Sequence, residues 1–370
     1  MPSETGVYTN AIGISSSIPN LGQWLRQKCD YETIYTGKWH LPGGRQFNIP
    51  GFKTPVTGLG GQGSLADGVV SSACAGFLRN RSDSKPFFMV CSLLQPHDIC
   101  QWLRMNLYSR DTLYFPQAAE HLPGLPENFE FDPNQEPEAI RRRRNSQEPV
   151  LGNWSRLHWR YYIYCYMRMI EQLDREIGRV LSAVENSRYA DNTLVILVSD
   201  HGEGLGSHQL VRKGCLYDEA CRVPMVISLP GRIRGDAVES RLASHLDIVP
   251  TVCDWLNIEP PADQRGSSLR PLLEGTNAGW RDFVVSEVSH GPGQLGRMVK
   301  TGRFKYITYA GDKTEQLFDM SSDPGETRNL AADSRFYSDL RGHRRLLAEW
   351  ESRLKRSGNL PADRIWRVRL

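Results

Sequence analysis

The sequence has little that would tie the protein to a membrane or to nucleic acid. None of its apolar runs approaches the roughly 20 residues that a membrane-spanning helix needs. Its formal net charge is only +3 over 370 residues, which indicates no general affinity for nucleic acids or membrane surfaces. The first residues, MPSETG, do not resemble a signal peptide. Hydrophobic residues make up 39% and charged residues 24% of the chain, as in ordinary globular proteins.

The sequence also lacks cysteine pairs in C-x-x-C spacing. Its eight cysteines are scattered, so they indicate neither a structural zinc site nor a dense disulfide framework. The one basic cluster, Arg141 to Arg144, lies in a stretch rich in Pro and Glu, roughly residues 117–153. This composition predicts a surface loop with solvated arginines rather than a phosphate-binding site.

What is present is an alternation of apolar strands and amphipathic helices. Expected strands are residues 31–36, 86–94, 193–199 and 225–229, and expected helices are residues 18–27 (capped by Ser17), 65–80, 159–184 and 248–256. This order predicts an α/β fold with a mostly parallel sheet flanked by helices.

From about Gly279 the pattern changes to short strands separated by turn residues. Four are expected, at residues 283–288, 297–300, 304–309 and 316–319, followed by a helix at 336–355. We therefore expect an α/β domain over residues 1–278 and a smaller C-terminal α+β domain, with a short antiparallel sheet, over residues 279–370.

The most informative junction follows the apolar run at 193–199, which predicts a fully buried parallel strand. Asp200 and His201 come directly after it, and Lys213 lies ten residues beyond Glu203. Ligand sites of open α/β sheets form at the carboxyl ends of strands. The Asp–His pair is placed to hold a metal, and Lys213 is a candidate anion ligand.

Two further strand ends carry polar residues of the same kind. Lys38 and His40 follow the strand at 31–36, and His97 follows the strand at 86–94. Because such ends meet at one edge of a parallel sheet, we expect two lysines and two histidines to surround one tetrahedral anionic ester. A histidine there is able to protonate the leaving oxygen.

These residues resemble the sulfatase family of the alkaline phosphatase superfamily. The resemblance runs from near Thr5 to about Leu330. Five segments carry it in order: Thr36–Leu41 (TGKWHL), Lys85–His97, Ser199–Pro224, Ser244–Thr251 (SHLDIVPT) and Leu317–Glu326. The resemblance implies an alkaline phosphatase-like fold and hydrolysis of a sulfate monoester to an alcohol and sulfate.

The resemblance also implies roles for individual residues. Asp200 and His201 would bind a divalent cation, which is usually calcium in this family. Because a histidine ligand is less typical of calcium, Mg²⁺ or another metal is also consistent with this pair. Lys38 and His40 would contact a formylglycine nucleophile. His97 and Lys213 would hold the sulfate oxygens, with His97 as the proton donor to the leaving alcohol.

We expect the family's defining element to be absent, because the chain resembles a sulfatase that lacks the N-terminal segment with the formylglycine signature. The Cys or Ser of a Cys/Ser-x-Pro-x-Arg signature becomes the formylglycine, but Pro2-Ser3-Glu4 has no such residue before it, and Glu4 stands in place of Arg. The family's first strand, with its metal-binding Asp pair, is not recognised either. We therefore expect an incomplete sheet, weak metal binding and little or no activity. A truncated gene model and a natural truncated paralogue are both consistent with this pattern.

Two other functions stay open. A phosphoesterase or phosphonate hydrolase of the same superfamily would use a similar site, and a non-catalytic relic would bind sulfate or glycans without turnover. The substrate is expected to be a small-molecule or carbohydrate sulfate ester, with Arg45, His208, Glu287 and His290 as candidate contacts. The resemblance suggests a periplasmic or secreted full-length form, and oligomeric state is not indicated.

Overall fold

The computed structural model describes residues 2–42, 49–56, 62–106, 116–146, 154–276, 279–289 and 295–354. Its helices are α1 (Pro2–Thr5), α2 (Leu21–Cys29), α3 (Gly63–Asn80), α4 (Ile99–Asn106), α5 (Glu138–Asn145), α7 (Arg156–Glu185), α8 (Asp218–Cys221), α9 (Ile248–Trp255), α10 (Arg270–Leu273) and α11 (Tyr337–Ser352). Its strands are β1 (Glu32–Gly37), β2 (Phe87–Ser92), β3 (Val195–Val198), β4 (Met225–Ser228), β5 (Phe283–Ser289), β6 (Leu295–Thr301), β7 (Phe304–Tyr309) and β8 (Gln316–Asp319).

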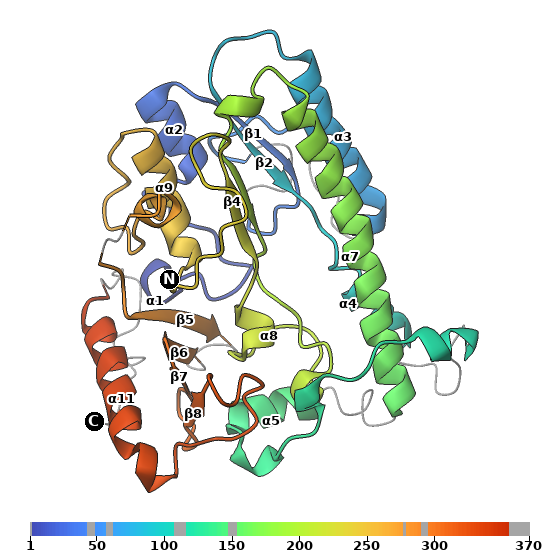
Figure 1. The fold of residues 1–370 in the computed structure, drawn as a ribbon, viewed down its shortest axis with the longest axis vertical. Helices are drawn as coiled ribbons and strands as arrows, with labels where there is room; N and C mark the ends of the chain where they lie inside the picture. Colours follow the sequence, from blue (N-terminus) through green and yellow to red (C-terminus); the bar gives the residue numbers. More distant parts are fainter. Residues whose placement is uncertain are drawn as a thin grey trace.

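The α/β part is layered, with strands between two groups of helices (Figure 1). Helices α3 and α7 run side by side along one flank, and α2 and α9 lie on the other. Apolar side chains of α3 such as Val70, Cys74 and Leu78 are buried. Helix–strand alternation therefore gives the predicted α/β fold, and no helix among the described residues is long and apolar enough to cross a membrane.

The strands of this part form two pairs. Strands β1 and β2 are parallel, from Glu32 opposite Phe87 to Gly37 opposite Ser92, as predicted. Strands β3 and β4 are antiparallel to each other, which the prediction of a mostly parallel sheet allows. Their connection contains only short helical turns, whereas parallel neighbours need a long crossover.

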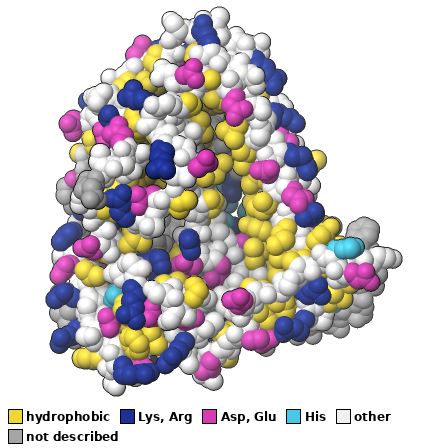
Figure 2. All heavy atoms as spheres, viewed as in Figure 1, with side chains coloured by type: hydrophobic (Ala, Val, Ile, Leu, Met, Phe, Trp, Pro, Cys, Tyr) yellow, Lys and Arg dark blue, Asp and Glu magenta, His cyan; other side chains and the backbone are white. Residues whose placement is uncertain are grey.

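The prediction that the strand at 193–199 is fully buried was wrong. Val198 is 39% exposed, and Val226 on the neighbouring strand is 57% exposed. Within the described ranges, no ladder joins the β1–β2 pair to the β3–β4 pair. Figure 2 shows a hollow in the middle of this face with hydrophobic side chains around it. Over the described residues the strands of this part therefore form two separate pairs.

The first predicted helix has a different cap from the one expected. Asn20, not Ser17, caps α2: its side chain accepts a hydrogen bond from the backbone N of Gln23 at 2.9 Å, and the Gln23 side chain accepts one from the backbone N of Asn20 at 3.0 Å. This reciprocal capping box satisfies two backbone donors at once. A single serine further upstream does not offer that pairing.

The C-terminal sheet matches the prediction closely. Its order is β5-β6-β7-β8, with every neighbouring pair antiparallel. Helix α11 packs on it through Leu340 and Leu347, which join a buried cluster with Val299, Tyr306 and Leu317. Alternating apolar residues and turns were a sufficient signal for this sheet.

Candidate active site

Lys38 is positioned by a glycine that the strand pairing requires. Gly37 has φ +107°, and a Cβ on it would lie 2.0 Å from the backbone O of Ser92. This close approach lets the backbone N of Lys38 donate to the same oxygen at 2.9 Å. The hydroxyl of Tyr35 donates to the backbone O of Lys38 at 2.5 Å. Lys38 therefore leaves β1 in a fixed direction.

His40, two residues further, has a partner that the sequence did not reveal. The side-chain Nδ2 of Asn10 lies 3.2 Å from Nδ1 of His40. The two residues are 30 positions apart in the sequence. No local sequence pattern links them, so only the folded structure shows that they are neighbours. Asn10 is therefore a further site residue, one that orients the His40 ring.

His97 is held by two buried carboxylates. Asp67 on α3 accepts hydrogen bonds from the backbone N of Leu94 at 2.7 Å and of Gln95 at 2.8 Å. Asp98 in turn accepts from the backbone N of Gly63 at 2.7 Å, at the start of α3. These reciprocal contacts clamp the segment after β2 to α3 and fix the position of His97 between them.

Three of the residues predicted to bind the anion act electrostatically on the fourth. The pKa of His97 is lowered to about 4, first by burial and then by the positive charges of Lys38, Lys213 and His40. Residues from three separate segments of the chain therefore lie within electrostatic range of the His97 ring. At pH 7 this imidazole is neutral and the cations around it favour an anion.

Asp200 and His201 are also adjacent in space. Nε2 of His201 lies 3.4 Å from Oδ2 of Asp200, and the two side chains are 34% and 69% exposed. They are placed to serve as two ligands of one divalent cation. Among the residues that the structure describes, however, no group of three His, Cys, Asp or Glu side chains could hold a metal, whereas calcium takes six to eight ligands. The pair alone does not complete a site.

The loop Ser199–Pro224, called here the Lys213 loop, has an unusual backbone. Four of its non-glycine residues have positive φ: Leu205, His208, Gln209 and Arg212. Non-glycine residues keep a positive φ only where surrounding contacts hold the backbone in that strained conformation. One contact is the buried carboxylate of Glu203, which accepts from the hydroxyl of Tyr162 at 2.6 Å and from the backbone N of Arg212.

The short helix α8 supports the start of the Lys213 loop. The backbone N of Gly202 donates to the O of Ala220 at 2.9 Å, and that of Glu203 donates to the O of Glu219 at 3.0 Å. A Cβ on Gly202 would lie 2.0 Å from the O of Glu219. A glycine after Asp200-His201 is therefore required for α8 to approach so closely.

Helix α8 is in turn joined to the C-terminal sheet by buried charges. Nζ of Lys305 on β7 lies 2.8 Å from Asp218 and 2.8 Å from Glu326. Burial alone would lower the pKa of Lys305, but these carboxylates raise it above its ordinary value. The ammonium is therefore charged in the folded protein, and it links the Lys213 loop to the C-terminal sheet.

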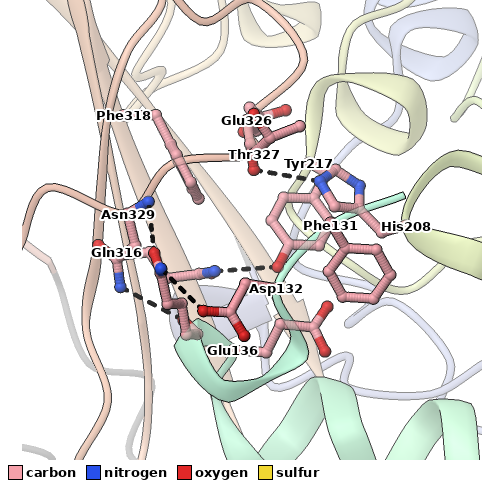
Figure 3. Close-up of a pocket in the computed structure, with 11 residues that line it drawn as sticks. Phe131, Asp132, Glu136, His208, Tyr217, Gln316, Phe318, Glu326, Thr327 and Asn329 are labelled. Atoms are coloured by element: carbon pink, nitrogen blue, oxygen red, sulfur yellow. Dashed lines mark hydrogen bonds between the residues drawn. The ribbon is translucent and has the colours of Figure 1, made fainter. Parts of the chain in front are cut away.

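His208 belongs to the same junction and not to a substrate surface. Its ring stacks on Tyr217, and one nitrogen lies 3.1 Å from the backbone O of Glu326 (Figure 3). The other nitrogen lies 2.9 Å from Oε1 of Glu219. Burial would lower the pKa of His208, but the Glu219 carboxylate raises it. Because the residue is 1% exposed, the prediction that it contacts substrate was wrong.

Glu287, another candidate substrate contact, is also buried. Its side chain is fully enclosed and binds Arg297 at 2.9 Å and the hydroxyl of Ser3 at 2.8 Å. That prediction was wrong for the same physical reason, since a buried carboxylate paired with an arginine is not available to a ligand. The other two candidates, Arg45 and His290, lie outside the described residues.

One Ser-x-Pro-x-Arg segment does occur, contrary to the expectation that the chain lacks this signature. It runs from Ser228 to Arg232, at the end of β4. Ser228 is opposite Val195 in the register, five residues before Asp200. At about 3.3 Å per residue, this places Ser228 roughly 16 Å from the metal pair. The segment is therefore not the nucleophile of this site.

Comparisons with known proteins agree with the geometry. A family model described as sulfatase matches residues 1–258, and one described as N-sulphoglucosamine sulphohydrolase, C-terminal, matches residues 206–351. The Delta 4,5-hexuronate-2-O-sulfatase of Bacteroides thetaiotaomicron is 30% identical over 98% of this chain and 79% of its own length. An arylsulfatase of Clostridium perfringens is 32% identical over 69% of this chain and 51% of its own length.

Solved structures show the same relationship. A 2-O GAG sulfatase superposes with a TM-score of 0.83 at 29% identity, over 95% of this chain and 79% of that chain. The phosphonate monoester hydrolase of Agrobacterium radiobacter shares the fold, with a TM-score of 0.72 at 22% identity over 96% of this chain and 84% of that one. The protein is thus a hydrolase of the alkaline phosphatase superfamily. Within that class, the chain belongs to the sulfatase family, since the family model matches more than half of it.

Proposed function

We propose that the protein acts on the sulfate monoester of a carbohydrate. The observation that carries this proposal is the positive charge that Lys38, Lys213 and His40, from separate segments, exert on His97. Fixed cations and N–H donors aimed at one point stabilise the charge of a sulfuryl group during transfer. The name of the hexuronate sulfatase relative supports a sugar substrate. So does a fold neighbour, 22% identical, that was solved with D-glucosamine-2-N,6-O-disulfate.

In this proposal each side chain has a separate task. Lys38 and Lys213 bind the non-bridging sulfate oxygens, and His40, oriented by Asn10, donates a hydrogen bond to the same group. The bound sulfate offsets the charges of Lys38 and Lys213 and raises the pKa of His97, so that the ring takes up a proton on binding. The imidazolium then gives this proton to the bridging oxygen, so that the leaving alcohol departs protonated and the ring is left neutral. The overall reaction consumes one water and yields the alcohol and sulfate.

Asp200 and His201 would hold a divalent cation, for which Ca²⁺ is the first candidate and Mg²⁺ the second. When bound, the cation adds positive charge beside the sulfate group.

We further propose that these 370 residues alone turn over sulfate esters slowly or not at all. The family uses a formylglycine nucleophile, and the Ser-x-Pro-x-Arg segment at Ser228 lies at the far end of β4 from Asp200. The intact mass of the native protein, compared with 42.0 kDa for this chain, tests whether further residues supply the nucleophile. A native mass equal to 42.0 kDa favours a protein that binds sulfate without turnover.

Binding and turnover are tested separately. Inorganic sulfate is titrated calorimetrically into the wild type and the variants Lys38→Gln and Lys213→Gln, which we expect to bind about tenfold to hundredfold more weakly. Lys53→Gln is the matched control, because that ammonium is 71% exposed and pairs with Glu32 on the surface. Sulfate affinity that is unchanged in both site variants would refute the proposal.

Turnover is measured with 4-methylumbelliferyl sulfate and phosphate and with a phenylphosphonate ester. Sulfate hydrolysis that disappears in His97→Asn supports the sulfatase. Faster hydrolysis of the phosphonate ester would favour the phosphonate monoester hydrolase alternative, which the shared fold keeps open.

A further inference from the structure

His208 lies at the tip of a hairpin in the Lys213 loop. The backbone N of Gly204 donates to the O of Arg212 at 2.9 Å, which closes the hairpin one residue before Lys213. The tip is strained, because His208 and Gln209 have φ of +49° and +51°, and non-glycine residues keep such values only under constraint. A contact that holds the tip therefore also holds the backbone that leads into Lys213.

Both ring nitrogens of His208 face hydrogen-bond acceptors. Nδ1 lies 2.9 Å from Oε1 of Glu219, and Nε2 lies 3.1 Å from the backbone O of Glu326. An ionised carboxylate and a backbone carbonyl accept hydrogen bonds but do not donate them. A neutral imidazole has one N–H, whereas the imidazolium has two. The imidazolium is therefore the form of His208 that satisfies both acceptors.

The surroundings of the ring also suit a cation. The ring stacks on Tyr217 with the two centroids 4.1 Å apart (Figure 3), and an aromatic face attracts positive charge. His208 is 1% exposed, so water does not readily replace a hydrogen bond that the ring loses. Burial alone would lower the pKa of His208, but Glu219 and the carbonyl of Glu326 raise it above its ordinary value of 6.5. Geometry and charge therefore favour the same protonation state.

The elements packed around His208 carry several titratable groups. These are Asp132, Glu136 and Arg144 from α5 and the segment before it, Tyr217, Asp218 and Glu219 from α8 and its cap, Lys305 and Glu326 from the C-terminal part, and Arg212 of the hairpin itself. Arg144 is not solvated as predicted, since it is 16% exposed and pairs with Glu136. Glu326 pairs with Lys305 at 2.8 Å. Within both pairs the charges offset each other, whereas Glu219 contacts the ring itself, so the imidazolium is its direct counter-ion.

We propose that His208 is a pH-operated latch on the Lys213 loop. As an imidazolium it joins the hairpin tip to α8 through Glu219 and to the C-terminal part through Glu326. When the pH rises, one ring proton passes to solvent, and one of the two acceptors then faces a lone pair instead of an N–H. A buried acceptor without its donor is costly, and the strained tip opens to water to relieve that cost.

Opening of the tip loosens the backbone at Arg212 and with it the position of Lys213. This consequence rests on the proposed function, in which Lys213 binds the sulfate oxygens. The protein should therefore bind sulfate more tightly while His208 is protonated than after the ring has lost its second proton.

The latch also fixes the sign of a pH effect on stability. The folded pKa of His208 lies above the ordinary value of 6.5, so between these values the folded state binds more protons than the unfolded state. The stabilisation is fully present below pH 6.5, and the free energy of unfolding should fall as the pH rises from 6.5 through the folded pKa. This window lies on the alkaline side of pH 6.5, whereas that of His97 lies on the acidic side.

The titration and its effect on sulfate are measured on the full chain. NMR of the imidazole nitrogens, assigned with His208→Gln, should show both nitrogens protonated at pH 6 and one of them losing its proton as the pH rises. Calorimetry at pH 6.5 and pH 9 measures the affinity for inorganic sulfate, which should fall about tenfold or more in the wild type. His121→Gln, which removes an exposed histidine, is the control and should show the same fall.

A second variant keeps the ring, so that the test does not depend on a protein without it. Glu219→Gln removes the charge of the counter-ion and should lower the pH at which the ring titrates. The pH at which sulfate affinity falls should move by the same amount. Glu185→Gln, at an exposed carboxylate of α7, should shift neither value.

The outcomes separate the latch from the proposed function. A ring of His208 that carries a single proton at pH 6, or a titration that Glu219→Gln does not shift, overturns the latch. A ring that titrates as expected while sulfate affinity stays constant overturns its coupling to Lys213. A wild type without Lys213-dependent sulfate binding refutes the proposed function, whereas the ring titration and the pH dependence of unfolding still decide whether His208 holds the hairpin.

Discussion

The ammonium of Lys305 on β7 lies 2.8 Å from the carboxylate of Asp218 on α8, and this contact connects the C-terminal sheet to the active-site loop. From Asp218 the connection runs through the backbone of α8 to Gly202 and Glu203, immediately beside Asp200 and His201. The small antiparallel sheet therefore supports the site through Asp218 and the backbone of α8.

Lys305→Met should destabilise the fold by about 3–5 kcal/mol, because it leaves the buried carboxylates of Asp218 and Glu326 without a counter-ion. Urea denaturation measures the change. Arg345→Gln is the control: its pair with Glu349 is a surface pair, with the two side chains 73% and 50% exposed, and its loss should cost no more than about 1 kcal/mol. Equal losses in the two variants would contradict the role given to Lys305.

His97 should titrate near pH 4 in the protein without added anion, and its pKa should rise when sulfate binds, because the anion offsets the charges of Lys38 and Lys213. NMR of the imidazole, assigned with His97→Asn, measures both values. Lys213→Met should also raise this pKa, whereas Lys53→Met should not. A pKa that stays near 6.5 in the anion-free wild type would show that the cations do not meet at this ring.

The same shift fixes the sign of a pH effect on stability. The folded pKa of His97 is about 4 and its ordinary value is 6.5, so between these values the unfolded state binds more protons. The free energy of unfolding should therefore fall as the pH drops from about 6.5 to 4. Above pH 6.5, His97 adds no pH dependence to the free energy of unfolding. Urea titrations at pH 7 and pH 5 should show a smaller decrease for His97→Asn than for the wild type.

Sequence patterns predicted those features that depend on neighbours along the chain. The four C-terminal strands were found within about two residues, because alternation and turns are local signals. The antiparallel pairing of β4 with β3 and the packing of Ile140 on the Lys213 loop depend on contacts between distant segments. Asn10, Asp67 and Asp98 were missed for the same reason, since each acts on a segment at least 27 positions away.

Gly37→Ala should cost more than about 2 kcal/mol, since its Cβ would overlap the backbone O of Ser92 and its φ is positive. Lys38 would move with it, and sulfate affinity should fall in parallel. Gly76→Ala on α3 is the control. A Cβ there meets nothing within 4 Å, so helix propensity should stabilise the fold by about 0.5–1 kcal/mol. A neutral effect at Gly37 would mean that β1 and β2 can separate at that end.

Calcium binding tests whether Asp200 and His201 need ligands from elsewhere. With two ligands only, the 370-residue chain should bind Ca²⁺ more weakly than about 1 mM, as six to eight oxygens are normally required. Calorimetry of the wild type, of Asp200→Asn and of the exposed control Asp191→Asn measures this affinity. Micromolar binding that disappears only in Asp200→Asn would show that residues outside the described ranges complete the coordination. Micromolar binding that survives Asp200→Asn would place the cation at another site and would remove Asp200 from the proposed ligands.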